Sequence, residues 1–177
     1  QGDLVQGTDG YLYGTLSSGG DQEKGVLFKI LPDGSNFAKI VVFDGTTKGS
    51  NPIASLLMGS NGKIYGSTYT GGANNQGCLF AVDNDGSNFT RLFDLNGATT
   101  GGNPLCKLIE GSDGLLYGMT SIGGTNNLGT IFKIAKDGTG FQKMADFNSS
   151  AAQPLYGPLV ESQPGKFFGM TSSGGAS

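Results

Sequence analysis

The chain of 177 residues contains no histidine and only two cysteines. Without imidazole, Ser-His-Asp and Cys-His catalytic systems and His-ligated metal sites are excluded. Charged residues are also scarce, at 14%, and the formal net charge is −3. Because this balance provides no basic surface, we expect neither nucleic acid nor an anionic membrane as a partner.

Long apolar runs are missing as well, and none approaches the roughly 18 residues of a membrane-spanning helix. The chain opens with Gln1 and shows no charged segment followed by an apolar one, so we expect a processed, excised or partial chain. Cys78 and Cys106 have no metal-ligand spacing and allow at most one disulfide. We expect both to be free, buried, small apolar residues.

Glycine, by contrast, is abundant, with 33 residues, and it marks an internal repeat. Double glycines, Asp-Gly turns and a Phe-containing apolar strand recur together, which makes chance a poor explanation. Aromatic-glycine pairs follow the same register in steps of 52, 52 and 51 residues, at Tyr13-Gly14, Tyr65-Gly66, Tyr117-Gly118 and Phe168-Gly169.

Each repeat predicts four short strands separated by turns. In the second unit these strands lie at about 53–58, 63–70, 78–83 and 88–94. The Asn-Gly and Asp-Gly turns supply the positive φ of tight hairpins, so neighbouring strands are expected to be antiparallel. Alternation places Phe80 and Val82 on one face of the third strand and Ala81 on the other. One such unit cannot bury both faces alone, so the units must stack on one another.

This pattern predicts an all-β fold, a β-propeller made of four-stranded antiparallel blades with a repeat of 51–52 residues. A β-solenoid is the competing architecture, and the tight Asp-Gly turns argue against it. Residues 1–177 then form a single propeller segment of about three and a half blades. Closed propellers typically have 4–8 blades, so we expect a part of a larger propeller or a chain that assembles with others. The units lie at about 1–51, 52–103 and 104–154, with a partial unit at 155–177.

A long motif runs from Leu108 to Phe141. It reads Leu-x-x-Gly-Ser-Asp-Gly-x-Leu-Tyr-Gly-x-Thr-x-x-Gly-Gly-x-x-x-x-Gly-x-Ile-Phe-Lys-Ile-x-x-Asp-Gly-x-x-Phe and resembles the GloVer tandem repeat of bacterial extracellular proteins. Similar units fill residues 4–37 and 56–89. The resemblance implies a secreted or surface-anchored bacterial protein of propeller type, often with a separate C-terminal sorting or anchoring segment. The family brings no established catalytic residues.

Polar loops after the double glycines are the candidate ligand-binding site. Together with threonines just upstream, they place hydroxyls and amides at one rim of every blade, which suits a glycan or a protein loop. The alternative interpretation is that these loops are solvated, hydrogen-bonded and without a ligand. The candidate ligand-binding residues are Thr68, Asn74, Asn75, Thr120, Asn126 and Asn127.

Other chemistry is weakly indicated. Most aspartates precede glycine and are typical of turn residues that bond their own backbone, so no catalytic pair emerges. Asp83 and Asp85 lie in an oxygen-rich stretch that we interpret chiefly as a hairpin turn, with Ca²⁺ binding as a minor option. No catalytic residue, metal or other cofactor is expected. The recurring Tyr13, Tyr65 and Tyr117 are interpreted as structural.

We therefore expect a non-catalytic extracellular or cell-surface module for binding or structural presentation, with a protein or glycan ligand at the blade loops. One alternative is a carbohydrate-active propeller enzyme whose carboxylates lie partly in blades outside this chain. A second alternative is a self-assembling surface or filament component, in which the blade faces meet end to end.

Overall fold

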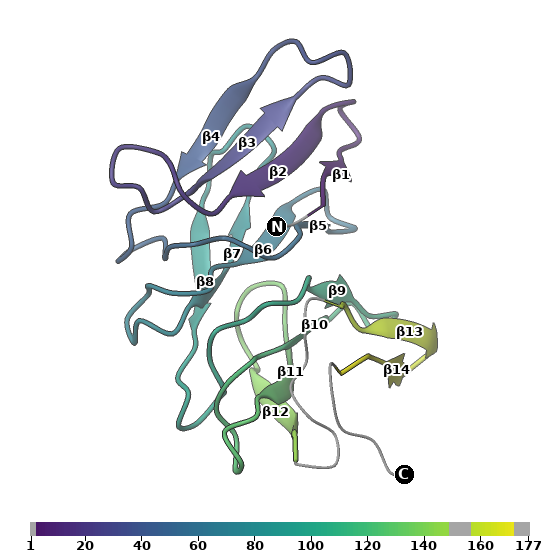
Figure 1. Ribbon diagram of the computed structural model, residues 1–177. Coiled ribbons are helices and arrows are strands. Elements are labelled where there is room, and N and C mark those ends of the chain that lie inside the picture. The colour runs from purple at the N-terminus through teal and green to yellow at the C-terminus, as the bar shows by residue number, and fades with distance from the viewer. Residues whose placement is uncertain (1–2, 149–156, 172–177) are drawn as a thin grey trace.

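The computed structural model describes residues 3–148 and 157–171, which form β-strands and contain no helix (Figure 1). The first sheet holds β1 (Val5–Gln6), β2 (Leu12–Leu16), β3 (Val26–Ile30) and β4 (Ala38–Val42). The second sheet holds β5 (Leu57–Met58), β6 (Ile64–Ser67), β7 (Cys78–Val82) and β8 (Thr90–Asp94). The third sheet holds β9 (Ile109–Glu110), β10 (Leu116–Met119), β11 (Thr130–Ile134) and β12 (Gln142–Asp146). A C-terminal hairpin of β13 (Val160–Gln163) and β14 (Lys166–Phe168) follows.

Each sheet follows chain order, and every neighbouring pair of strands is antiparallel. The predicted all-β fold of four-stranded antiparallel sheets is therefore confirmed for the three sheets. Turns such as Asp33-Gly34 join the third strand to the fourth, with Gly34 at a φ of 85°. Within the described ranges, no helix has the length and apolar character needed to cross a membrane.

The first strand of each unit is shorter than predicted. In the second unit only Leu57 and Met58 pair with β6, although the apolar run begins at Ile53. Ser50 bridges Thr70 beyond the end of β6, and Asn51 accepts a hydrogen bond from the N–H of Tyr69 at 2.9 Å. The ladder is therefore interrupted between Asn51 and Leu57. Pro52 explains this interruption, because it lacks an N–H donor. Its ring also packs against Gly25 of the preceding unit, where a Cβ would stand 2.5 Å from Pro52 Cδ.

The sheets stack in succession along the chain (Figure 1), and the core lies between them. Burying these faces removes apolar surface from water, which is what holds one unit against the next. Between the first and second sheets, Tyr13, Leu27, Val41 and Phe43 meet Leu56, Ile64, Phe80 and Val82. Between the second and third sheets, Tyr65, Leu79, Ala81 and Leu95 meet Leu108, Leu116, Phe132 and Ile134.

The outer face of the first sheet has no such neighbour among the described residues. Leu4 and Phe37 are each 53% exposed there. Leu56, which occupies the same place as Leu4 in the second unit, is only 1% exposed. The side chains that seal the later interfaces are thus present on this face but face solvent.

Candidate functional site

The predicted rim loop of the second unit, residues 71–77, is closed by its own hydrogen bonds. The N–H of Gly77 donates to the carbonyl of Gly71 at 3.1 Å, and the N–H of Gly71 donates to Oδ1 of Asn75 at 3.1 Å. Asn75 adopts a left-handed backbone with φ of 54°, a conformation that asparagine tolerates better than most residues. Asn74 Nδ2 donates to the carbonyl of Leu95 at 2.9 Å and ties the loop to the end of β8.

The third unit repeats this loop at residues 123–129. Asn127 has φ of 55°, and its Oδ1 accepts from the N–H of Gly123 at 2.9 Å. Asn126 Nδ2 donates to the carbonyl of Phe147 at 3.1 Å. In the first unit Glu23 takes the place of Asn75, with φ of 54° and a hydrogen bond from the N–H of Gly19 at 3.0 Å. The fold of the loop therefore recurs while its side-chain chemistry changes.

Part of the amide chemistry in these loops stays available. Asn74, Asn75, Asn126 and Asn127 are all exposed. Within the described residues, no hydrogen bond is formed by Oδ1 of Asn74 or by Nδ2 of Asn75. The loop of the second unit consequently offers one acceptor and one donor at a rigid position, without a formal charge on either side chain.

The two candidate threonines lie in the interior and not on the exposed loops. Thr68 and Thr120 are both 0% exposed, so a ligand in solvent does not reach their hydroxyls. Thr68 Oγ1 lies 3.3 Å from Cys78 Sγ, and Thr120 Oγ1 lies 2.9 Å from Thr130 Oγ1. Gly49 of the connecting segment covers Thr68 closely, since a Cβ at Gly49 would stand 2.2 Å from Thr68 Oγ1. The expected placement of these hydroxyls on an open rim is corrected accordingly.

Asp83 and Asp85, the minor Ca²⁺ option, bond to protein groups at the opposite end of β7 from the rim loop. Asp83 forms an ion pair with Lys63 and accepts from Asn88 Nδ2 at 2.7 Å. Asp85 Oδ1 accepts from the N–H of Ser87 at 2.8 Å, as the turn interpretation expects. In the part of the chain that the structure describes, no group of three Asp, Glu, Cys or His side chains converges as a metal site.

A second polar cluster, missed by the sequence analysis, joins the second sheet to the third. Ser60 donates its N–H to Glu110 Oε2 at 2.8 Å and its hydroxyl to Glu110 Oε1 at 2.6 Å. Lys136 Nζ donates to Ser60 Oγ at 2.7 Å and forms an ion pair with Glu110. We call Ser60, Glu110 and Lys136 the inter-sheet clamp. Its signal in the sequence is the recurrence of Ser at 60 and 112 and of Glu at 110 and 161.

The clamp does not act as a serine nucleophile with a lysine base, because that chemistry needs an uncharged lysine amine. Burial alone would raise the pKa of Glu110, but hydrogen bonds from Lys136 and Ser60 outweigh it and lower that pKa. Glu110 is thus an anion at neutral pH and engages the lysine amine in an ion pair. Ser112 and Glu161 repeat the contact to the hairpin, with the N–H of Ser112 2.7 Å from Glu161 Oε2.

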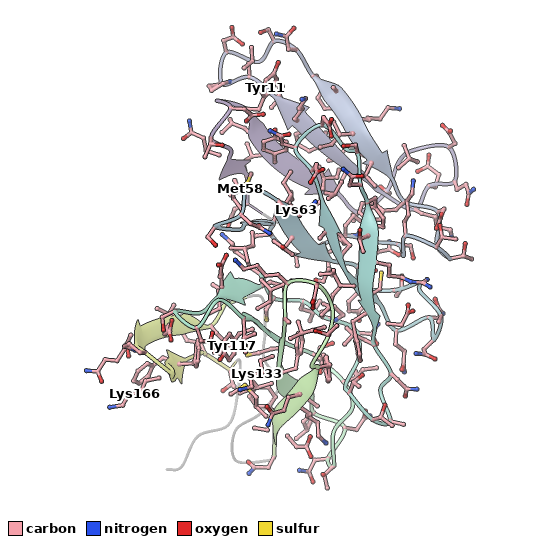
Figure 2. The ribbon with its side chains drawn as sticks, turned by 180° about the vertical axis from the view of Figure 1, so that it is seen from behind. Tyr11, Met58, Lys63, Tyr117, Lys133 and Lys166 are labelled. Atoms are coloured by element: carbon pink, nitrogen blue, oxygen red, sulfur yellow. The ribbon has the colours of Figure 1, made fainter. Side chains whose placement is uncertain are left out.

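The recurring tyrosines are buried and bonded to hairpin turns, as the structural interpretation expects. Tyr117 donates its hydroxyl to Asp113 Oδ2 at 2.7 Å, and Tyr13 donates to Asp9 Oδ2 at 2.6 Å. Burial and the neighbouring Asp113 raise the pKa of Tyr117 to about 12. The side chain of Tyr117 lies between the third sheet and the C-terminal hairpin (Figure 2), where its ring centroid is 4.2 Å from that of Phe167.

Both cysteines are free and buried, as expected. Burial raises the pKa of each thiol to about 11. A buried thiol that stays protonated at neutral pH is a poor nucleophile, so neither Cys78 nor Cys106 is a candidate reactive group.

The stacked four-stranded sheets and repeated rim loops define an all-β, propeller-like repeat protein. The sequence profile of the Gloeobacter/Verrucomicrobia repeat matches residues 1–177, and the chain belongs to this bacterial repeat family. The resemblance to the GloVer repeat is thereby confirmed. The sequence matches no curated protein.

Several solved structures share the fold at low sequence identity. A chain of a nidogen/laminin complex is 20% identical, with a TM-score of 0.60, over 89% of this chain and 51% of its own. The extracellular domain of a candidate one-component system from B. thetaiotaomicron is 13% identical, with a TM-score of 0.65, over 97% of this chain and 20% of its own. A gluconolactonase from Xanthomonas campestris is 14% identical, with a TM-score of 0.53, over 89% of this chain and 49% of its own.

The chain therefore spans about half the length, or less, of these structural relatives. At such identities the likeness concerns the fold alone. It places the three stacked sheets among propeller-like repeat proteins without assigning an activity to them.

Proposed function

We propose that this chain is a non-catalytic extracellular repeat module that binds a neutral polar ligand, a glycan first and a protein loop second, at residues 71–77 and 123–129. The observation that supports this most is the repeated rigid loop with exposed Asn74 and Asn126. Both side chains are fixed by a hydrogen bond to the end of the fourth strand, so binding would immobilise little additional structure. Repeated at a fixed spacing, such weak polar contacts gain affinity through multivalency.

We also propose that the three sheets and the hairpin are about three and a half blades of a larger propeller, with units near 1–51, 52–103, 104–154 and a partial one at 155–177. Two facts support this. The matched structural relatives are about twice as long or longer, and the outer face of the first sheet exposes Leu4 and Phe37. In the later units the equivalent leucines, Leu56 and Leu108, are buried, and the equivalent phenylalanines, Phe89 and Phe141, are half-buried. Closure with further blades would remove that apolar surface from water.

Localisation outside the cell or on its surface belongs to the same proposal. One structural relative is described as an extracellular domain, and the GloVer resemblance implies secretion or surface anchoring. Loops that present uncharged amides to solvent are consistent with a role in contact with polymers outside the cell.

A carbohydrate-active enzyme is the second candidate, because one structural relative is a gluconolactonase. Hydrolysis of a glycosidic bond needs a carboxylic acid with a raised pKa beside a carboxylate. The pKa values of Glu110, Asp113 and Glu161 are instead lowered, by their hydrogen bonds, against any effect of burial. None of these three groups suits the acid role of a glycosidase.

A glycan array probed with the labelled 177-residue chain tests the proposed function. We expect retention of a subset of neutral glycans and at least a tenfold loss of signal in the double variant Asn74→Ala/Asn126→Ala. Ser35→Ala, in the hairpin turn at the other end of the first sheet, serves as the matched control and should bind like the wild type. Equal retention by the double variant, or no retention of any glycan, would contradict the glycan proposal.

A further inference from the structure

The second unit departs from the repeat at two positions that meet at one tyrosine, Tyr65. Lys29 and Lys133 pair in register with the tyrosine of the second strand in the first and third units, and Ala81 takes that place beside Tyr65. In the first and third units an aspartate also accepts a hydrogen bond from the hydroxyl of this tyrosine, whereas the second unit has Asn61 there. The second unit has thus lost one cation and one anion at the same place.

Between the first and second sheets, the polar groups at this place bond to one another. The Tyr13 hydroxyl lies 2.6 Å from Asp9 Oδ2 and 3.2 Å from the carbonyl oxygen of Asn84. Lys29 Nζ donates to the same carbonyl at 3.5 Å and lies 4.6 Å from the centroid of the Tyr11 ring. Asn84 Nδ2 donates back to Asp9 Oδ2 at 3.3 Å. These bonds close the turn end of the first interface.

At the equivalent place between the second and third sheets, a cavity of about 390 Å³ opens. Tyr65, Ala81 and Leu92 form its apolar wall, and every residue of its lining lies in the described second and third units. Ala81 lacks the stem and the ammonium group of the lysine in the other units, so the protein does not fill this volume. The volume is near the lower end of the range for small-molecule pockets and suits one small ring.

The cavity has an unused hydrogen-bond donor and an unused acceptor. The Tyr65 hydroxyl accepts from Asn61 Nδ2 at 3.0 Å, and Asn61 Oδ1 accepts from the N–H of Lys63 at 3.3 Å. Within the described residues, the hydroxyl proton of Tyr65 has no acceptor, and the carbonyl of Lys136, the equivalent of Asn84, accepts no hydrogen bond. Because Tyr65 is only 1% exposed, an unused proton there is costly, and a ligand that accepts it lowers the free energy.

Charges around the cavity favour an uncharged ligand. Lys63 forms an ion pair with Asp83, and Lys136 forms one with Glu110. Asp137 also lines the cavity, and hydrogen bonds within its own turn lower the pKa of its carboxyl. Both lysines are therefore already paired while a further carboxylate lies nearby, so an anion gains no net attraction here.

We infer that this cavity binds the acetamido group of an N-acetylated sugar. The carbonyl oxygen of that group accepts the proton of Tyr65, and its N–H donates to the carbonyl of Lys136. Its methyl group packs against Ala81 and Leu92, which a sugar bearing only hydroxyls cannot match. This inference goes beyond the proposed function, because the cavity lies at the opposite end of β7 from the rim loop.

Titration of N-acetylglucosamine, followed by saturation-transfer NMR, tests the inference, with glucose as the matched sugar that lacks the acetamido group. The protein is the 177-residue chain with Asn74→Ala/Asn126→Ala, so binding at the rim loops does not contribute. We expect saturable binding with a Kd on the order of 1 mM, the strongest transfer to the acetamido methyl, and at least tenfold weaker binding of glucose. Binding this weak is washed off an array, so the result is independent of the rim-loop test.

Two substitutions in that chain restore what the repeat carries in its other units, so the melting temperature should stay near that of the parent. Ala81→Lys places the lysine of the first and third units in the cavity, and affinity for N-acetylglucosamine should fall at least tenfold. Asn61→Asp gives Tyr65 the acceptor that Tyr13 and Tyr117 already have, and affinity should fall at least threefold.

The control variant is Lys143→Ala, which removes an ion pair with Asp146 beside the rim loop of the third unit. It should bind N-acetylglucosamine like the parent. No saturable binding at millimolar N-acetylglucosamine, equal binding of glucose, or undiminished affinity in either folded variant, Ala81→Lys or Asn61→Asp, overturns the inference.

Discussion

Gly118 lies directly beneath the ring of Phe132, and a Cβ built on Gly118 would stand 2.5 Å from Phe132 Cζ and 2.7 Å from Leu108 Cδ2. Both neighbours are buried in the interface between the second and third sheets, so neither can move aside freely. We therefore expect Gly118→Ala to lower the free energy of unfolding by about 1–3 kcal/mol, the usual cost of overpacking. Urea unfolding, followed by far-ultraviolet circular dichroism, measures this change in the free energy of unfolding.

The control for that prediction is Gly169→Ala. A Cβ at Gly169 would meet Leu159 Cδ2 at 3.0 Å and Met119 Sδ at 3.8 Å instead of an aromatic ring. This variant should unfold at nearly the same urea concentration as the wild type. Equal destabilisation by the two substitutions would mean that the ring contact is not what requires glycine.

The inter-sheet clamp gives a pH-dependent prediction. Because the pKa of Glu110 is lowered in the folded chain, the clamp stabilises the fold above the ordinary value of 4.5, and this stability is lost as pH falls through the folded pKa. Glu110→Gln should lower the free energy of unfolding by about 1–2 kcal/mol at pH 7, from the lost charge-assisted hydrogen bonds. The difference from the wild type should shrink below pH 4.5.

A double-mutant cycle checks whether this effect belongs to the contact itself. Ser60→Ala removes the hydroxyl that Glu110 accepts, so the two substitutions together should cost less than the sum of their separate costs. Strict additivity, or a difference between Glu110→Gln and the wild type that persists at pH 3, would argue that the clamp does not couple the sheets.

Tyr117 gives a prediction for stability at alkaline pH. Its pKa is raised to about 12, so its contribution is fully present below the ordinary value of 10 and is lost as pH rises from there toward 12. Tyr117→Phe keeps the ring against Phe167 but removes the bond to Asp113, at a cost of about 1 kcal/mol at pH 7. The variant should lose less stability than the wild type between pH 10 and pH 11, measured by urea unfolding at each pH. A steeper alkaline loss in Tyr117→Phe would contradict the assignment.

The sequence predicted most of the architecture because the repeat carries its own turn chemistry. Asp-Gly turns such as Asp33-Gly34 indicate where hairpins form, and alternation placed Phe80 and Val82 together on the face that packs against the first sheet. The length of the first strand was mispredicted, since apolar content at Ile53 indicates burial but not pairing. Pro52, which lacks an N–H donor, marks the interruption in the sequence, whereas its contact with Gly25 of the preceding unit is visible only in three dimensions.

The candidate site was harder to predict. Alternation along the second strand does not indicate that the next connecting segment covers its end, so Thr68 looked accessible although Gly49 lies over it. Asn75 was correctly placed on an exposed loop, yet its role in closing that loop through Gly71 depends on a backbone conformation that composition alone does not specify. The clamp between Ser60 and Glu110 joins residues 50 positions apart, a contact that only stacking of the units creates.

Cys78 in the second unit and Thr130 in the third unit occupy equivalent positions, and this equivalence predicts which residues can replace Cys78. In the third unit, Thr130 bonds to Thr120 and to the carbonyl of Thr100 at 2.9 Å. Cys78 makes the same two contacts, to Thr68 and to the carbonyl of Lys48. Cys78→Thr should therefore change the free energy of unfolding by less than about 1 kcal/mol, while Cys78→Val removes the hydrogen bonds and should cost about 1–2 kcal/mol. Thermal unfolding separates the two variants, and a Val variant as stable as the Thr variant would contradict the role given to these bonds.

The proposal that the rim loops bind without turnover is tested most directly by calorimetric titration of the best glycan from the array into the wild type and into Asn74→Ala/Asn126→Ala, followed by mass measurement of the recovered glycan. We expect saturable binding to the wild type, at least tenfold weaker binding to the variant, and a glycan of unchanged mass. A cleaved glycan, or equal affinity for both proteins, would contradict the proposed function.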